Sequence, residues 1–226
     1  MRVAALYDIH GNLPALEAVL EEVDADTTIV VGGDVVGGPF GGETLEALRA
    51  LGGRAVWLRG NTERELVEQP PPREGGPPPG EIERMRADLT DEQVEFVYGL
   101  PERVELDVDG LGRVLFCHAV PQNDLDIVTP LTPDERLASI VAGLETDAVV
   151  AGHTHMQEDR RVAGVRWVNA GSVGMPYEDA AGAYWALLGP DVELRRTDYD
   201  ASRLGGFEYP HASRQEAAEY FESLVD

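Results

Sequence analysis

The chain has 226 residues, of which 43% are apolar, so it can bury a substantial core as one large domain or two small ones. Its formal charge is −24, from 42 acidic and 18 basic residues, and every basic residue is arginine. Because so negative a surface repels nucleic-acid backbones, nucleic acid is not an expected partner.

No apolar run approaches the roughly 18 residues that a membrane span requires, and residues 1–8 do not resemble a secretory signal. The one cysteine, Cys117, excludes an intrachain disulfide, which fits a reducing compartment. We therefore expect a cytoplasmic protein without a membrane partner.

Short apolar segments alternate with amphipathic ones at the start of the chain. Residues 3–7, 28–31 and 55–58 predict buried strands, and residues 13–22 and 44–51 predict helices. Asn12 is a suitable N-cap for the first of these helices. The alternation favours a layered α/β architecture.

A proline-rich segment, residues 69–80, then interrupts the pattern. Its prolines cannot donate the backbone hydrogen bonds that a helix or a sheet requires, so we expect a loop. The loop either covers a site as a lid or is a surface insertion without function, and the second interpretation is favoured.

The rest of the chain predicts both helices and strands. Thr90–Gln93 matches a capping box for a helix that ends before Pro101. Further helices are predicted over 133–144 and 213–225, strands over 148–151 and 165–168, and hairpins over 104–117 and 183–196. With no convincing linker, we expect a single domain, 1–226, with a core of 1–196, the insert 69–80 and a helical tail, 197–226.

Polar residues that can bind metals follow the predicted strands. Two of them, His153 and His155, lie in the segment Ala151–Met156, where alternate residues of an extended chain point to the same side. Loops after the strands of a layered α/β fold gather at one edge, so the whole set is expected to meet. The set is Asp8, His10, Asp34, Asn61, His118, His153 and His155.

Taken singly, the aspartates and the asparagine of this set are common turn and cap residues, but together with four histidines they favour a ligand set. The donors include no thiolate and are too many for one structural zinc ion. They suit a pair of divalent transition-metal ions, manganese before iron, nickel, cobalt or zinc, better than magnesium or calcium alone. Asp34 is the natural bridge. Two ions lower the pKa of a shared water, so that hydroxide is available for in-line attack on a clamped phosphoryl group.

The motifs Asp8-x-His10, Gly33-Asp34, Gly60-Asn61, the His118 segment and Gly152-His153-Thr154-His155 resemble, in order and approximate spacing, those of the calcineurin-like metallophosphoesterase family. The chain is most similar to its small bacterial and archaeal phosphodiesterase branch, whose Asn-Pro-Gly-Ser-Val-Gly segment resembles residues 169–174. The resemblance covers residues 1–196. It implies a four-layer αββα sandwich of two mixed β-sheets flanked by helices, and dinuclear metal catalysis.

The resemblance also implies roles for individual residues. One ion would be held by Asp8, His10, Asp34 and His155, and the other by Asp34, Asn61, His118 and His153. Asp34, Asn61 and His118 would position the nucleophile and the phosphate of a small phosphoester substrate, with Gly11, Asn12 and Thr62 at its edge.

One departure from the family concerns the general acid. The family commonly follows its Gly-Asn with His-Asp or His-Glu, and that histidine protonates the leaving group. Here Thr62 and Glu63 stand at these positions, and threonine is not an efficient acid near neutral pH. We therefore expect phosphodiesters or activated esters as substrates. His211 is expected to be an exposed tail residue, with a role as substitute acid the lesser alternative.

Other functions stay open, because substrate preference depends on loops such as 69–80 and 120–130. Among enzymes these are a phosphomonoesterase or protein phosphatase, a nucleotide pyrophosphatase and a cyclic-nucleotide phosphodiesterase. A protein-binding scaffold of the same fold is the non-catalytic alternative, although such members are expected to lose ligands and none is missing here. Secondary candidates for the pocket are Arg59, Arg160, Arg161, Tyr177 and Glu178.

Overall fold

Alternate residues of strand β1 (Val3–Leu6) pack into two different cores, which places this strand inside a layered structure. Val3 and Ala5 face a core between two sheets, whereas Ala4 and Leu6 face a core beneath helices. Both faces are buried, as expected for an apolar strand with a parallel neighbour. The computed structural model describes residues 1–225.

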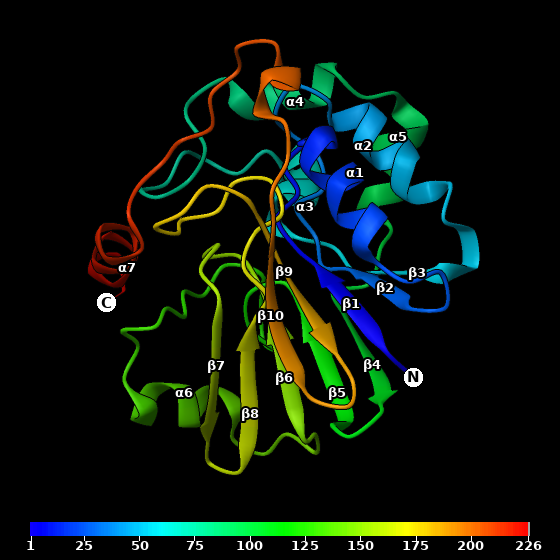
Figure 1. Ribbon diagram of the computed structural model, residues 1–226. Coiled ribbons are helices and arrows are strands. Elements are labelled where there is room, and N and C mark those ends of the chain that lie inside the picture. The colour runs from blue at the N-terminus through cyan, green and yellow to red at the C-terminus, as the bar shows by residue number, and fades with distance from the viewer. Residues whose placement is uncertain (226) are drawn as a thin grey trace.

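Within these residues the chain forms two five-stranded mixed sheets (Figure 1). The first, in the order β10-β9-β1-β2-β3, contains β1, β2 (Thr28–Val31), β3 (Ala55–Trp57), β9 (Ala183–Leu188) and β10 (Val192–Thr197). The second, in the order β4-β5-β6-β8-β7, contains β4 (Arg103–Val108), β5 (Gly112–Cys117), β6 (Ala148–Ala151), β7 (Glu158–Val162) and β8 (Val165–Asn169).

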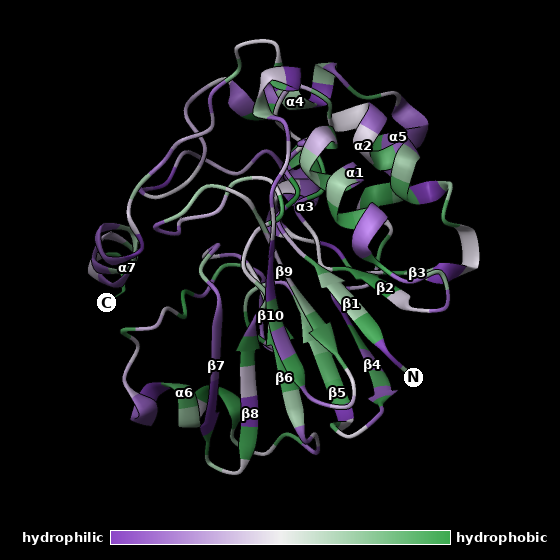
Figure 2. Cartoon of the chain, in the orientation of Figure 1, coloured by the Kyte–Doolittle hydropathy of each residue, from purple (hydrophilic) through white to green (hydrophobic). Residues whose placement is uncertain are grey.

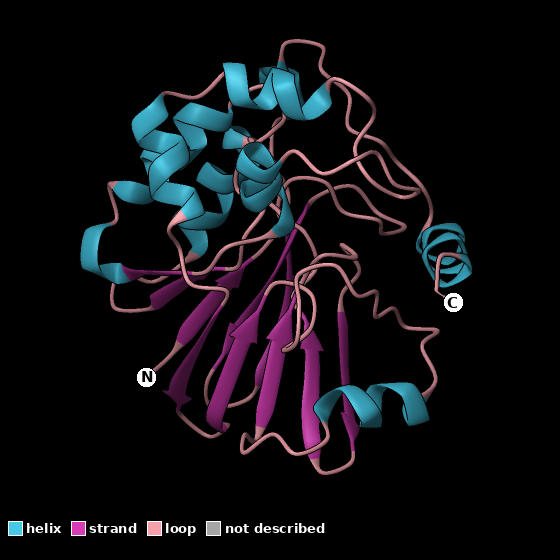
Figure 3. Cartoon of the chain, turned by 180° about the vertical axis from the view of Figure 1, so that it is seen from behind, coloured by secondary structure: helices cyan, strands magenta, loops and turns pink. Residues whose placement is uncertain are grey.

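Helices cover the outer face of each sheet. Against the first sheet lie α1 (Leu13–Glu22), α2 (Gly41–Arg49), α3 (Asn61–Glu68) and α5 (Asp91–Tyr98), and against the second lies α6 (Asp134–Val141) (Figure 3). Separate apolar clusters fill the three spaces between layers. The predicted four-layer αββα sandwich is confirmed.

Strand β7 and helix α4 (Glu81–Ala87) are not among the elements predicted from the sequence. Strand β7 has the sequence Glu-Asp-Arg-Arg-Val, which lacks an apolar alternation, and it forms a hydrophilic edge strand antiparallel to β8 (Figure 2). Helix α4 directly follows the proline-rich loop and has no buried residue. Because β7 lies at a sheet edge and α4 is not buried, neither segment has the apolar periodicity from which strands and helices are predicted.

Most predicted elements are confirmed within a few residues. Helix α1 begins after Asn12, whose side chain accepts a hydrogen bond from the Ala15 backbone N–H. Helix α2 begins at Gly41 instead of Thr44, because the packing of Leu45 and Leu48 outweighs the low helix propensity of glycine. Both predicted hairpins form, as β4-β5 and β9-β10, and the tail contains α7 (Arg214–Ser223), preceded by a short 3-10 helix (Ala201–Leu204). In the described part of the chain, no helix is both long and apolar enough to cross a membrane.

Candidate metal centre

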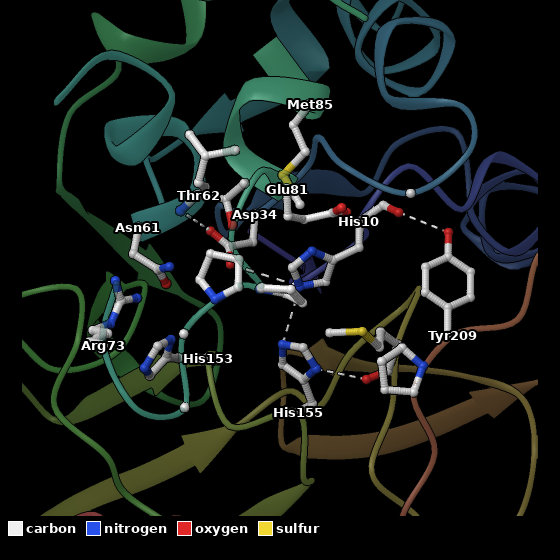
Figure 4. Close-up of a pocket in the computed structure, with 18 of the residues that line it drawn as sticks. His10, Asp34, Asn61, Thr62, Arg73, Glu81, Met85, His153, His155 and Tyr209 are labelled. Carbon is white, nitrogen blue, oxygen red and sulfur yellow. Dashed lines mark hydrogen bonds and ion pairs between the residues drawn. The ribbon is translucent and has the colours of Figure 1, made fainter. Parts of the chain in front are cut away.

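The seven predicted ligands all lie at the carboxyl ends of strands, and the two sheets bring these ends together. Asp8 follows β1, Asp34 follows β2 and Asn61 opens α3 after β3, while His118 follows β5 and the histidine pair follows β6. Figure 4 shows the imidazoles of His10, His153 and His155 around one central space. Six of the seven residues are buried, and His153 is partly exposed.

Five of these residues have a left-handed backbone conformation that non-glycine residues rarely adopt. The φ angles are 51° at Asp8, 46° at His10, 52° at Asp34, 67° at His153 and 61° at His155. Each such residue costs roughly 1 kcal/mol or more, and this strain commonly accumulates at functional sites. The fold therefore maintains an unfavourable backbone in order to direct these side chains inward.

Two groups of donor atoms form within the site. In the first, His155 Nε2 lies 3.4 Å from Asp8 Oδ1 and 3.2 Å from His10 Nε2. In the second, His118 Nε2 lies 3.6 Å from Asp34 Oδ1 and 3.8 Å from Asp8 Oδ1. Asn61 Oδ1 joins the second group at 3.1 Å from His118 Nε2. Each group has the composition and the size of a metal-ligand set.

His153 lies beside these groups without belonging to either. Its ring is 5.2 Å from that of His118, centroid to centroid, and its Nε2 is hydrogen-bonded to the Leu125 carbonyl oxygen at 3.1 Å. Because a carbonyl only accepts, Nε2 carries the proton and Nδ1 is the nitrogen with a lone pair.

Backbone carbonyls also determine the tautomers of two other histidines. Nδ1 of His118 donates to Gly32 O at 2.9 Å, and Nδ1 of His155 donates to Met175 O at 2.7 Å. In neutral rings this leaves both Nε2 atoms as electron-pair donors that face the carboxylates. A second hydrogen bond of this kind is the usual way in which proteins orient metal-binding histidines.

The residues present fit a metal. Asp8 Oδ2 accepts a hydrogen bond from the His153 backbone N–H at 2.8 Å, but its other oxygen, Oδ1, is fully buried and has no hydrogen-bond partner. An unpartnered buried carboxylate oxygen is costly unless a cation binds it. Imidazole and carboxylate donors without thiolates suit divalent transition metals.

Burial and neighbouring charges lower the pKa of two histidines of the cluster and raise the pKa of a third. Burial, aided by the neighbouring His155, lowers the pKa of His10 to about 4, and burial aided by His118 lowers the pKa of His153 to about 4. Burial acts in the same direction on His118, but Asp34 and Asp8 outweigh it and raise its pKa to about 9. Burial opposes ionisation of Asp8, yet His155 and His118 hold the pKa of that carboxyl below its usual range.

Glu63 supports the site from behind, and the sequence-based ligand set does not include it. Its carboxylate accepts hydrogen bonds from the backbone N–H groups of Asp34, Val35 and Gly60 at 2.9, 2.7 and 2.9 Å. The residue is only 1% exposed. The sequence does contain a signal for this role. A glutamate three residues after the N-cap, here Gly60, is typical of the half of a capping box in which the glutamate binds the N-cap backbone N–H.

Two glycines allow the aspartates to lie this close to the backbone. A Cβ on Gly152 would lie 2.4 Å from Asp8 Oδ2, and a Cβ on Gly60 would lie 2.2 Å from Asp34 Oδ1. Any side chain at either glycine would therefore displace an aspartate of the site. In addition, the Thr62 backbone N–H donates to Asp34 Oδ1 at 2.8 Å.

A cavity of about 620 Å³ opens in front of the donors, and several predicted residues line it, including Thr62 and Tyr177. Residues 73–78 of the proline-rich loop form part of the cavity wall, which the lid interpretation requires. Gly11 and Asn12 are not among the lining residues. Asn12 is buried, with its side-chain amide donating to Gly174 O and Tyr199 Oη.

The secondary candidates mostly have other partners. Arg59 donates to Tyr98 O, Arg160 donates to Thr132 O, and Glu178 accepts from the Gln157 backbone N–H. Arg161 and His211 do not line the cavity, and His211 is exposed, as expected for the tail. Tyr177 alone among the secondary candidates reaches the site, where its ring stacks on His155.

Structural comparison finds related folds. A metallophosphoesterase from Sphaerobacter thermophilus is 24% identical, with 98% of each chain covered and a TM-score of 0.70. A hypothetical protein from Pyrococcus horikoshii OT3 is 23% identical, with 90% of each chain covered and a TM-score of 0.78. Vacuolar Protein Sorting 29 from Cryptosporidium parvum is 14% identical, with 88% of this chain and 97% of that protein covered and a TM-score of 0.52.

Comparison with curated proteins returned no match. The model of the calcineurin-like phosphoesterase superfamily domain matches residues 1–189, which is most of the chain and includes every donor described above. The chain therefore belongs to the calcineurin-like phosphoesterase superfamily.

Proposed function

We propose that the protein is a dinuclear metal-dependent phosphoesterase that hydrolyses phosphodiesters. The observation that carries the proposal is the convergence of two donor groups, with Asn61 and His153 beside the second, on the buried, unpartnered Oδ1 of Asp8. One ion is assigned to Asp8, His10, Asp34 and His155, and the other to Asp34, Asn61, His118 and His153. Manganese is the first metal to test, followed by iron, nickel, cobalt and zinc.

Bound divalent ions would supply Lewis-acid stabilisation of the phosphoryl charge and would lower the pKa of a water molecule that attacks phosphorus. The chain's own groups position the reactants. Asp34 has its backbone N–H bound by Glu63 and its Oδ1 bound by the Thr62 N–H, so its orientation is set before substrate binds. Hydrolysis forms a bond from the water oxygen to phosphorus, and the ester bond to the leaving oxygen breaks.

The preference for diesters rests on the proton that this leaving oxygen requires. Thr62 lines the cavity where the family commonly has a histidine, and the histidines that line the cavity in the described chain are themselves assigned to metal. General acid catalysis contributes roughly 10²- to 10⁴-fold in rate. Without it, substrates whose leaving group departs readily as an anion are favoured, and alkyl monoesters are not.

A protein-interaction scaffold is the second candidate, because the fold is similar to that of Vacuolar Protein Sorting 29. A complete donor set with strained backbone argues against it, since a scaffold has no need of either. The two candidates therefore differ in turnover by the metal-loaded protein.

The test is metal analysis by mass spectrometry combined with assays on bis(4-nitrophenyl) phosphate and 4-nitrophenyl phosphate. We expect two ions per chain and faster hydrolysis of the diester. Asp34→Ala should abolish both, whereas Asp26→Asn, at an exposed position, should change neither. A protein that carries two manganese ions and hydrolyses neither ester would support the scaffold. Nucleotide pyrophosphate and cyclic-nucleotide substrates in the same assay distinguish the remaining enzyme alternatives.

A further inference from the structure

Much of the cavity wall beyond the donors is apolar, and it comes from two segments outside the sandwich. Residues 73–78 of the proline-rich loop form one part, and tail residues form another, namely Phe207, Tyr209, Pro210, Phe221 and Leu224. The two segments meet, since a Cβ on Gly75 would lie 2.6 Å from Leu224 Cδ1. Ile82 and Met85 of α4 extend the apolar surface.

This wall contacts the donors directly. The Tyr177 ring stacks on His155, with centroids 5.4 Å apart and an interplanar angle of 14°, and it contacts the Phe221 ring at 5.8 Å. On the other side, Tyr209 Oη donates a hydrogen bond to the His10 carbonyl oxygen at 2.8 Å (Figure 4). A substituent on a phosphorus atom held by the donors would therefore lie against aromatic and aliphatic side chains.

Each arginine of the wall is already paired with a carboxylate. Arg73 Nη2 is paired with the buried Glu65 at 2.8 Å, and Arg84 is paired with Glu81 at 2.5 Å. Arg84 also contacts Asp88 at 3.2 Å. Glu74 adds a further carboxylate to the lining. An additional negative group on the substrate would be repelled by these carboxylates, because both arginines among the described lining residues already have a carboxylate partner.

We propose that the substrate is a phosphodiester whose retained ester group is large, uncharged and apolar, either aryl or alkyl. This specificity rests on the phosphodiesterase function proposed above. Burial of apolar surface against this wall stabilises the bound state by about fourfold in affinity for each buried methylene. Nucleotides and other polyanionic esters are correspondingly poor substrates.

The experiment uses the metal-loaded protein and four diesters that share 4-nitrophenolate as leaving group, with methyl, butyl, phenyl or 4-carboxyphenyl as the retained group. Rates are divided by those of alkaline hydrolysis to remove intrinsic reactivity. We expect kcat/KM to rise at least about tenfold from methyl to butyl and phenyl, and to fall at least about tenfold from phenyl to 4-carboxyphenyl. Equal values for methyl, butyl and phenyl would overturn the proposal, as would unimpaired hydrolysis of the carboxyphenyl ester.

A matched pair of variants locates the effect. Leu224→Ala removes part of the wall, and the ratio of kcat/KM for the phenyl and methyl esters should fall about fivefold. Leu131→Ala, at an exposed leucine that does not line the cavity, should leave that ratio unchanged. Ile82→Ser provides a second wall variant should Leu224→Ala melt at a lower temperature. A ratio unchanged in both wall variants would refute the assigned wall.

The specificity and the underlying function fail in different ways. No hydrolysis of any of the four esters by protein that carries two metal ions removes the proposed function together with the specificity. Hydrolysis of all four at similar rates leaves the phosphodiesterase function in place and removes only the specificity.

Discussion

Glu63 Oε2 accepts a hydrogen bond from the Asp34 backbone N–H at 2.9 Å, and this contact joins the loop after β2 to the start of α3. The same oxygen accepts from Gly60 N–H at 2.9 Å, while Oε1 accepts from Val35 N–H at 2.7 Å. One buried carboxylate thus satisfies the orphan donors of two strand-end turns. These are the turns that present Asp34 and Asn61.

Glu63→Gln should lower the free energy of unfolding by about 2 to 4 kcal/mol. Glutamine keeps the shape, but its NH₂ group faces backbone N–H donors on one side, and each buried unsatisfied group costs about 1 to 3 kcal/mol. Urea unfolding of the metal-free protein measures this through the midpoint at unchanged slope. Glu68→Gln on the same helix, whose side chain is 44% exposed, is the matched control and should change stability by less than about 0.5 kcal/mol. Equal stability of Glu63→Gln and Glu68→Gln would contradict the role given to Glu63.

The pH dependence of the metal-free protein should reflect His118. Its pKa in the folded state, about 9, lies above the ordinary histidine value of 6.5, because Asp34 and Asp8 outweigh burial. The protonated ring therefore stabilises the fold fully below pH 6.5, and this contribution disappears as pH rises through 9. Thermal melts of the chelated protein between pH 6 and 10 should show this loss.

His118→Gln is the comparison, since it cannot be protonated. The difference in stability between wild type and variant should shrink from pH 6.5 to pH 9, and a constant difference would argue against the raised pKa. Metal loading requires the same proton to leave, so wild type should release about one proton more than the variant when metal is added at pH 7. Calorimetry in buffers of different ionisation enthalpy measures that difference.

The layered α/β architecture was predictable because its inner strands are apolar and its helices are amphipathic, whereas the four-layer sandwich was implied by the resemblance of the motifs to a known family. Val3, Ala5 and Tyr7 on one face of a strand, with Ala4 and Leu6 on the other, already require two cores. Strand β7 and helix α4 were not, because neither buries an apolar face that a periodicity detects.

The candidate site was predictable to a similar degree. Aspartate, asparagine and histidine after apolar runs were expected to converge, and their donor atoms do lie within a few ångströms of one another. The sequence does not indicate that His153 Nε2 bonds to the Leu125 carbonyl, or that tail residues such as Tyr209 reach the site. Such contacts depend on how loops with no periodic pattern pack, which tertiary structure alone determines.

Replacing His153 or His155, which are two residues apart, should affect different ions. His155 Nε2 lies beside Asp8 and His10, so His155→Ala should lower occupancy of that position. The His153 ring lies beside His118, so His153→Ala should lower occupancy next to His118 and Asn61. Anomalous diffraction at the manganese edge resolves the two positions. His211→Ala, at an exposed histidine outside the cavity, should retain both ions. Loss of the same ion in both single variants would refute the assignment.

Thr62→His should raise the hydrolysis of esters with poor leaving groups. The backbone N–H of residue 62 donates to Asp34 Oδ1 whatever its side chain, so the substitution leaves that contact in place while adding an imidazole at the cavity wall. An acid there should raise the rate by roughly 10²-fold or more when the leaving group needs a proton. It should change the rate little when 4-nitrophenolate departs. The measurement is the ratio of kcat/KM for two phosphodiesters that share the same retained group and differ in the leaving group, phenolate or 4-nitrophenolate. Thr62→Ser, which retains a hydroxyl, is the control and should keep the wild-type ratio. An unchanged ratio in Thr62→His, at full metal content, would show that residue 62 does not face the leaving group.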